Sequence, residues 1–339
     1  MRKARRCSSS PRHFALKQMT ATTLPAARAS GFAQKAPGAT SEIIFRWACA
    51  SAATLLLATL SGVVISLAIG GWPAFHTFGF QFLTSTTWDP VGEVYGAAGP
   101  IAGTLITAFL ALLMALPLAM GASIFLVEFA PARLSRPIAM AIELLAGIPS
   151  IVYGMWGLFV FAPWFAEHVQ MPLMMAATPG SWLETLVQGV PNGANIFTAS
   201  MILAIMILPY MAAVFRELLL TVPAQVREAG YGLGCTPFEV MKSVTVPYVG
   251  QGMIGVIMLG LGRALGETMA VTFIIGNAHN FPKSMFDSGS TIASTIASEF
   301  AEASSPEHTA ALIALGFVLF VITFIVLAIA RILLARSKR

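Results

Sequence analysis

The stretch TAALIALGFVLFVITFIVLAIA at residues 309–330 contains no charged side chain. It is long enough to cross the hydrocarbon core of a bilayer as one helix, which needs about 20 predominantly apolar residues. Lipid offers no hydrogen-bond partners, so a crossing segment must pair its own backbone N–H and C=O groups, and a helix does this. We therefore predict a membrane-spanning helix near 309–332.

Further charge-free stretches precede it, and the composition of the whole chain agrees. Of 339 residues, 57% are hydrophobic and only 10% are charged, with a mean hydropathy of +0.78. Typical soluble domains carry about 25% charged residues, which excludes a soluble enzyme or a secreted disulfide scaffold. We predict an all-α polytopic membrane protein with six transmembrane helices, near 47–71, 99–127, 138–162, 196–220, 248–276 and 309–332.

Lysine and arginine residues are concentrated on one side of these spans. All except Lys283 and Arg263 lie before the first span, in the connections 128–137 and 216–246, or after the last span. The positive-inside rule therefore places both termini in the cytoplasm. The opposite face is acidic, and it carries Asp89, Glu93, Glu167, Glu184, Asp287, Glu299, Glu302 and Glu307.

The regions outside the spans suggest a division of the chain. Residues 1–44 are predicted to be a disordered basic cytoplasmic tail, because 1–41 contain no Asp or Glu and no hydrophobic run. A transit peptide and a natural start at Met19 are alternatives for this segment. Residues 45–98 are assigned to the first transmembrane helix with its outer loop, and 99–335 to the remaining helices.

Motifs for hydrolysis and metal binding are absent from the sequence. It contains no G-x-x-x-x-G-K-[ST] phosphate loop, no H-E-x-x-H and no G-x-S-x-G. Cys7, Cys49 and Cys235 are far apart and odd in number, which favours neither a disulfide framework nor a metal site. We predict that the chain is not an enzyme, hydrolyses no nucleotide, holds no metal or other cofactor and binds no nucleic acid.

The predicted cytoplasmic loop 222–247 contains REAGYGLGC at 227–235 and VTVP at 244–247. A short helix, a glycine break and a second helix ended by a proline would form a rigid knob able to dock on a partner. The alternative is a polar connection between helices in which the glycines occur by chance and have no docking role. The segment resembles the E-A-A-x3-G-x9-I-x-L-P loop of ABC importer permeases, with Glu228, Ala229, Gly234, Val244, Val246 and Pro247 at matching positions. It departs from the motif where Gly230 replaces the second alanine and the two valines replace the Ile and Leu. The resemblance implies a coupling helix that docks on an ATPase subunit.

Two charged residues fall inside the fifth predicted span. Arg263 and Glu267 are four residues apart, so on an unbroken helix their side chains share a face. An arginine there can bind a tetrahedral oxyanion through its forked donors, and Glu267 would neutralise it at rest and compete with the substrate. The alternative is a salt bridge that only fixes helix packing. Gly262 and Gly266 form a small-xxx-small pair, for which we expect a packing role.

The segments RALGETMAV at 263–271 and ELLAGIPSIVYGMWG at 143–157 narrow the resemblance to phosphate ABC importer permeases of the PstC type, over about 45–335. This resemblance implies a type I ABC importer permease fold in the bacterial inner membrane, with 99–335 as the permease core. It also implies import of inorganic phosphate together with a sister permease, two ATPase subunits and an extracytoplasmic phosphate-binding protein. Arg263 and Glu267 match the charged pair of the family's translocation path. Glu143 is either a gate or an interfacial residue, and Pro149 with Ser150 predicts a kink near the start of the third span.

Three alternatives stay open at this point. An ABC importer of the same kind could carry molybdate, sulfate or phosphonate instead of phosphate. The chain could be a membrane scaffold that signals phosphate status through a partner. A secondary transporter or a membrane enzyme would act without any ATPase.

Overall fold

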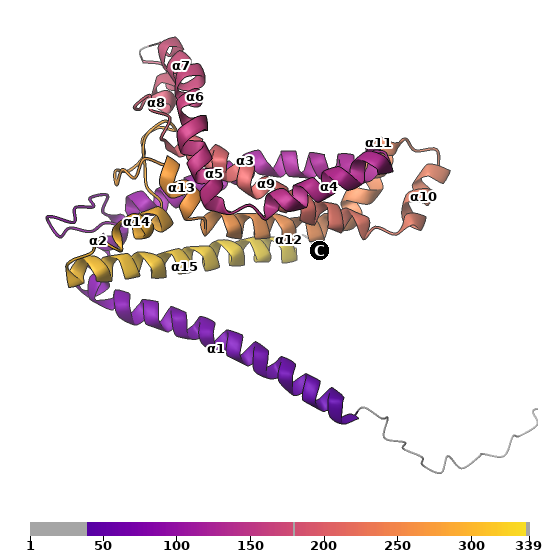
Figure 1. Cartoon of the computed structure of the whole chain (residues 1–339), viewed down its shortest axis with the longest axis horizontal. Helices are drawn as coiled ribbons and strands as arrows, with labels where there is room; N and C mark the ends of the chain where they lie inside the picture. Colours follow the sequence, from indigo (N-terminus) through magenta and orange to yellow (C-terminus); the bar gives the residue numbers. More distant parts are fainter. Residues whose placement is uncertain (1–38, 179, 337–339) are drawn as a thin grey trace, which may run out of the picture. The chain divides into compact units, whose positions relative to one another are not determined.

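The computed structural model describes residues 39–178 and 180–336, and these form a helical protein (Figure 1). Within them, extended pairing is limited to isolated bridges between single residues. The chain divides into two compact units at Leu57, inside the first helix, α1 (Ala39–Phe78). In the first unit, residues 41–57 of α1 are exposed. The predicted tail lies outside the described residues up to position 38, and α1 begins before the expected boundary at 44.

Helices long and apolar enough to cross a membrane occur at the expected places. Within the described residues, five of them qualify on their own, and a sixth if one bent pair counts as a single span. The five spans are Ser41–Phe78, Ala98–Phe129, Ile196–Leu220, Pro237–Leu265 and Pro306–Ile332. They correspond to α1, α3 (Ala98–Ile124) with the π turn η1 (Phe125–Phe129), α9 (Ile196–Leu220), the run α11–η4–α12, and α15 (Pro306–Arg336).

The third span is bent at the expected kink, beside Pro149 and Ser150, and the range 138–162 is divided between two arms instead of forming one helix. Its first arm, α4 (Ala132–Ala146), meets the second arm, Ser150–Ala176, at 89°. The break falls at Pro149, which lacks a backbone N–H and disfavours helical geometry in the residue before it. The second arm consists of α5 (Ser150–Trp156), η2 (Gly157–Phe161), α6 (Ala162–Phe165), η3 (Ala166–Gln170) and α7 (Met171–Ala176), followed after a short connection by α8 (Trp182–Val187).

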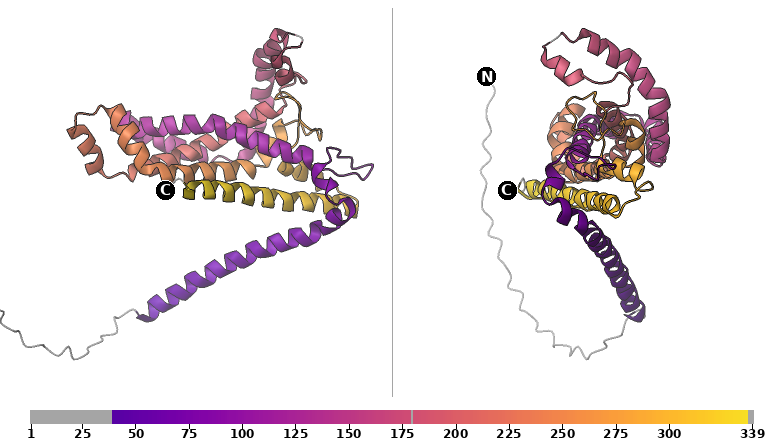
Figure 2. Two further views of the ribbon diagram at one scale, coloured as in Figure 1. Left: turned by 180° about the vertical axis from the view of Figure 1, so that it is seen from behind. Right: turned by 90° about the vertical axis from the view of Figure 1, so that its left-hand side faces the viewer.

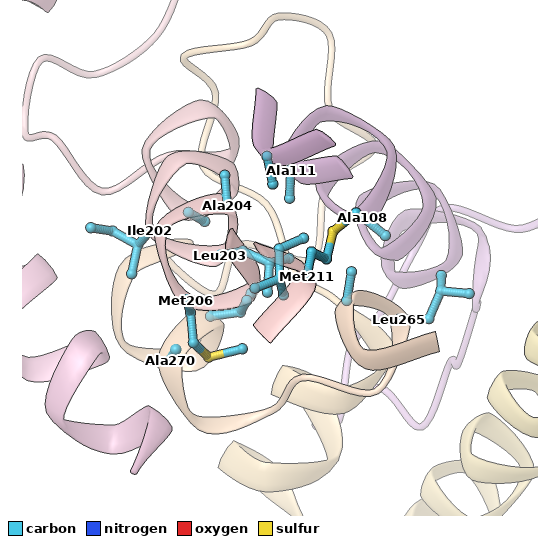
Figure 3. Packing of buried hydrophobic residues seen from close by; sticks show 14 of the residues in the cluster. Ala108, Ala111, Ile202, Leu203, Ala204, Met206, Met211, Leu265 and Ala270 are labelled. Carbon is cyan, nitrogen blue, oxygen red and sulfur yellow. The ribbon is translucent and has the colours of Figure 1, made fainter. Parts of the chain in front are cut away.

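The core of the second unit is centred on α3 and α9, which pack together along most of their length. Ala108, Ala111, Ala115 and Ala119 recur at helical spacing on α3 and are at most 1% exposed. Figure 3 shows Ala108 and Ala111 beside the α9 residues of the same cluster. Small side chains let the helix backbones approach closely. In a bilayer, where lipid is as apolar as the side chains, this close packing is what drives helices to associate. Ser123 adds a hydrogen bond across the contact, since its Oγ donates to the Ala212 carbonyl at 2.8 Å.

The bundle of the second unit has two distinct ends, visible in Figures 1 and 2. At the α10 end lie α10 (Ala224–Gly232) and α11 (Pro237–Val240), followed by the π turn η4 (Met241–Thr245) and α12 (Val246–Leu265). At the opposite end, here called the α14 end, lie α2 (Gln81–Thr84), α13 (Met269–Ile274), α14 (Ile292–Glu299) and the loops around them.

Candidate functional site

Arg263 lies in the last turn of α12, about 26 Å along the helix from Val246 at 1.5 Å per residue. Its side chain is half-buried, and the guanidinium carbon lies 5.5 Å from the centre of the Tyr210 ring on α9. The buried Nε has no hydrogen-bond partner. No carboxylate of the described residues lies within 4.0 Å of its nitrogens. The guanidinium therefore makes no ion pair within the described part of the chain.

Glu267 is not on the same helix as Arg263, so the predicted geometry of this pair is wrong. The expected helix over 248–276 ends at Leu265 and resumes as α13 at Met269. Gly266, a poor helix former, caps α12 with φ −91°. The carboxylate of Glu267 accepts a hydrogen bond from the Ala270 N–H in the first turn of α13, at 3.4 Å. Negative charge at a helix start is favourable, so Glu267 stabilises the break instead of neutralising Arg263.

A groove of about 1000 Å³ lies between α9, α12 and α15, on the side of Arg263 nearer the α10 end. Its lining on α12 includes Gly252, Gly255 and Leu259. Arg263 follows Leu259 by four residues and so lies on the same face of α12. Tyr210 likewise precedes the lining residue Val214 by four residues and lies on the same face of α9. Most of the lining is apolar, with Glu217 and Arg331 as its charged members.

The glycines of α12 divide into two groups. A Cβ at Gly260 would lie 2.6 Å from the sulfur of Met211, so this glycine permits close packing on α9. Beside Gly255 and Gly262, by contrast, an added Cβ would meet no atom within 4 Å. At Gly266 it would meet only a carbonyl of its own helix. The packing expected for Gly262 and Gly266 is therefore not made within the described chain, and this stripe of α12 is open.

Glu143 lies near the end of α4 and is 57% exposed. Its Oε1 is 3.7 Å from Nη1 of Arg216 on α9. Arg216 makes a shorter contact, 2.7 Å, with the neighbouring Glu217. Glu143 thus belongs to a loose ion-pair chain beside the groove, and its role as a gate stays a prediction.

The predicted coupling loop has the expected helix, glycine turn and second helix. Glu228 and Ala229 are exposed on α10, and the chain turns at Gly234 with φ +84°, a conformation that favours glycine. Thr236 then starts α11 with a capping box. One detail differs, because Pro247 does not end the second helix. The run Pro237–Leu265 is continuous, and the π turn η4 ends at Thr245, two residues before the proline, which has no N–H to donate.

Several residues of this loop were not singled out by the sequence analysis. Leu233 is 86% exposed and Phe238 is 58% exposed, so the knob presents apolar side chains at its tip. On its inner side, Arg227 pairs with the buried Glu128 at 3.2 Å. Both charges were visible in the sequence, but their meeting depends on the fold, since they are 99 positions apart.

At the α14 end, Glu299 was expected to contribute to an acidic outer face, but it is only 14% exposed. Its two oxygens lie 2.8 Å from Nε2 of His279 and 2.9 Å from Nε2 of His308. The indole N–H of Trp88 donates to both of them. Burial raises the pKa of Glu299, but the hydrogen bonds from His279, Trp88 and His308 together hold the pKa below its ordinary value. We call these four residues the Glu299 cluster.

Residues 115–339 match a family described as binding-protein-dependent transport system inner membrane component. The chain belongs to this family. Among its relatives are two named phosphate transport system permease protein PstC. The one from Mesorhizobium japonicum is 52% identical over 92% of this chain and 96% of the relative. The one from Pasteurella multocida is 51% identical over 88% of this chain and 93% of the relative.

A solved structure supports the fold of this inner membrane component. It is a chain of a bacterial alginate ABC transporter in complex with alginate pentasaccharide-bound periplasmic protein. The TM-score is 0.58 at 16% identity, with 89% of this chain and 99% of that chain covered. The predicted type I ABC importer permease fold is therefore confirmed. The family is one of transport components, so the prediction that the chain is not an enzyme is confirmed as well.

Proposed function

We propose that this inner membrane component forms half of an ATP-driven import path for inorganic phosphate. The observation that carries the proposal is Arg263, whose guanidinium is half-buried within a spanning helix and has no carboxylate partner among the described residues. The forked N–H donors of a guanidinium match a tetrahedral oxyanion. A charged side chain inside the membrane is costly, and such residues mark functional sites. The names of the relatives support phosphate as that oxyanion.

Two features keep the affinity of this site low enough for transit. Arg263 lies at the carboxyl end of α12, where the helix dipole places partial negative charge. The face of Tyr210 also supports the cation, which reduces its demand for an anion. In this proposal Glu267 lies on the same path, and it shapes the break between α12 and α13 so that Arg263 stays exposed to the anion.

The surfaces of the chain support an assignment of the partners. We assign the open glycine stripe of α12, at Gly255, Gly262 and Gly266, to the sister permease that completes the path. The knob of α10 and α11 is assigned to one of two ATPase subunits, with Glu228 and Ala229 on its exposed side. The α14 end is assigned to an extracytoplasmic phosphate-binding protein.

The orientation follows from charge. Arg227, Lys242 and Arg331 lie on segments at the α10 end, whereas the loops at the α14 end carry mostly carboxylates. The positive-inside rule then places the α10 end and both termini in the cytoplasm of a bacterial cell with this inner membrane component. An acidic outer mouth is compatible with anion import because a binding protein delivers the substrate.

We retain Glu143 as a candidate gate. Its contact with Arg216 links α4 to α9 one residue from Glu217, which lines the groove. Opening this contact would free a positive charge beside the cytoplasmic part of the path.

The test is uptake of radiolabelled phosphate in cells that carry the full complex. We compare wild type with Arg263→Gln and Arg263→Lys, and Arg133→Gln serves as the matched control because Arg133 is exposed on α4. We expect Arg263→Gln to abolish uptake without loss of assembly, Arg263→Lys to retain a small part, and the control to transport normally. Excess sulfate or molybdate should not compete.

Two outcomes would contradict the proposal. If Arg263→Gln transports phosphate at the wild-type rate, Arg263 has a packing role only. If sulfate, molybdate or a phosphonate is the anion that wild type moves, the family assignment stands and the substrate is wrong.

A further inference from the structure

Glu128 and Arg227 form an ion pair at the junction between the coupling knob and the bundle. Glu128 lies in η1, the last turn of the α3 span, and its side chain is only 6% exposed. Arg227 lies in α10 and is 22% exposed, with Nη1 3.2 Å from Oε1 of Glu128. A buried carboxylate is costly unless it is paired and hydrogen-bonded, so this contact is strongly favoured over separation.

The same pair also contacts two other segments. The hydroxyl of Thr245, which is fully buried at the end of η4, donates to the same Oε1 at 3.5 Å. The second Nη of Arg227 donates to the carbonyl of Val222, just beyond α9, at 3.4 Å. A single guanidinium–carboxylate pair thus joins α10 to the ends of three spans.

The backbone contacts of α10 are made mainly with α11 and η4. Two side chains of α10 reach toward the α3 span: Arg227 pairs with Glu128, and Val226 packs on the apolar cluster of Leu219, Val222 and Val249, against which residues of the α3 span also pack. The next residue, Glu228, is exposed on the assigned docking side. Neighbouring helix positions differ by about 100°, so one helical turn presents Glu228 outward while Arg227 reaches inward.

We propose that Arg227 and Glu128 are positioning residues that transmit displacement of the coupling helix to α3 and α12. This inference rests on the proposed docking of the knob on an ATPase subunit. Arg227 touches neither phosphate nor nucleotide. Its effect is to keep α10 from moving independently of the spans, so that ATP-driven movement of the knob reaches the path at Arg263.

The test uses the complete complex in proteoliposomes and measures phosphate imported per ATP hydrolysed. The variants are Arg227→Met, Arg227→Lys and Glu128→Gln, with Arg136→Met as a control for loss of an exposed arginine on α4. We expect Arg227→Met and Glu128→Gln to assemble and hydrolyse ATP while the ratio falls about tenfold. Arg227→Lys keeps a charge within reach and should retain an intermediate ratio, whereas Arg136→Met should match wild type.

A double variant, Glu128→Leu with Arg227→Met, separates transmission from folding because it leaves no buried charge unpaired. If the proposal is correct, its transport ratio stays low although the complex is stable. A wild-type ratio in this double variant, or in Arg227→Met, would overturn the proposal. Where the single variants do not assemble, the double variant decides. Failure of the proposed function would show differently, since the wild-type complex itself would import no phosphate.

Discussion

Replacing Glu299 by glutamine tests how the α14 end is held together. The carboxylate accepts hydrogen bonds from the indole of Trp88 and from Nε2 of His279 and His308. Stacking supports the same arrangement, because the Trp88 ring stacks on His279 at 5.8 Å and Tyr95 stacks on His308 at 5.3 Å. One side chain therefore joins the loop before α3, the loop after α13, and α14 to α15.

The magnitude follows from the number of donors. A glutamine offers one acceptor oxygen, and its amide faces a histidine donor where the second carboxylate oxygen was. About two of the hydrogen bonds are lost, and bonds to charged groups make a net contribution of about 1.5–3 kcal/mol each. Since Glu299 is partly exposed and one histidine can change tautomer, we expect Glu299→Gln to lower the free energy of unfolding by about 2–4 kcal/mol.

The assay is thermal unfolding of the purified protein in detergent at pH 7. For a chain of this length, a loss of this size should lower the apparent Tm by about 3–6 °C. The matched control is Glu302→Gln, three residues further on, because Glu302 is exposed. It should leave the Tm within about 1 °C of wild type. Equal Tm values for wild type and Glu299→Gln would refute the idea that this carboxylate organises the α14 end.

The pH dependence of the difference gives a second check. The pKa of Glu299 is lower in the folded protein than its ordinary value of 4.5. Its contribution to stability is therefore fully present above about pH 4.5 and is lost as the pH falls through the lowered folded-state pKa. The stability difference between wild type and Glu299→Gln should shrink in that acidic range. A difference that grows on acidification would contradict the assignment.

Three further predictions concern packing, capping and the coupling turn. A Cβ at Gly71 would lie 2.8 Å from the α15 backbone. Gly71→Val should therefore lower stability by about 1–3 kcal/mol, whereas Gly62→Ala, with open space around it, should not change the Tm. Asn195 caps α9 by accepting from Thr198 N–H at 2.8 Å, so Asn195→Ala should cost about 1–2 kcal/mol in thermal unfolding and Asn195→Ser clearly less. Gly234→Ala places a side chain at φ +84° and should weaken binding of the isolated ATPase subunit, measured by pull-down or calorimetry, while Gly232→Ala should not.

The spans were predictable because lipid imposes one simple condition, a long run without charge. That condition located α9 and α15 to within a few residues. It does not report helix continuity: the proline, and not the hydropathy, indicated the kink at Pro149, and the break after Leu265 was missed. Both breaks lie inside apolar stretches, where local backbone chemistry decides the geometry and hydropathy does not change.

The site could be located from the sequence, but its contacts could not. Arg263 stood out as a charge inside a span, yet its neighbour Tyr210 lies on another helix. Glu267 was paired with Arg263 on the assumption of an unbroken helix, and the structure gives it a backbone partner instead. The contact of Glu128 with Arg227 depends on how the α3 span and α10 meet, which no spacing in the sequence records.

The alanine contact between α3 and α9 determines where this molecule can bend. Two helices whose backbones lie this close cannot slide without opening voids, because packed interiors switch between discrete arrangements. The two helices should move as one rigid body during a transport cycle, and the hinges should be the two breaks, at 147–149 and 266–268. Spin labels across α3 and α9 would then keep a constant separation in every state. The distance between labels on either side of 266–268 would change each time the path switches between its inward-facing and outward-facing states.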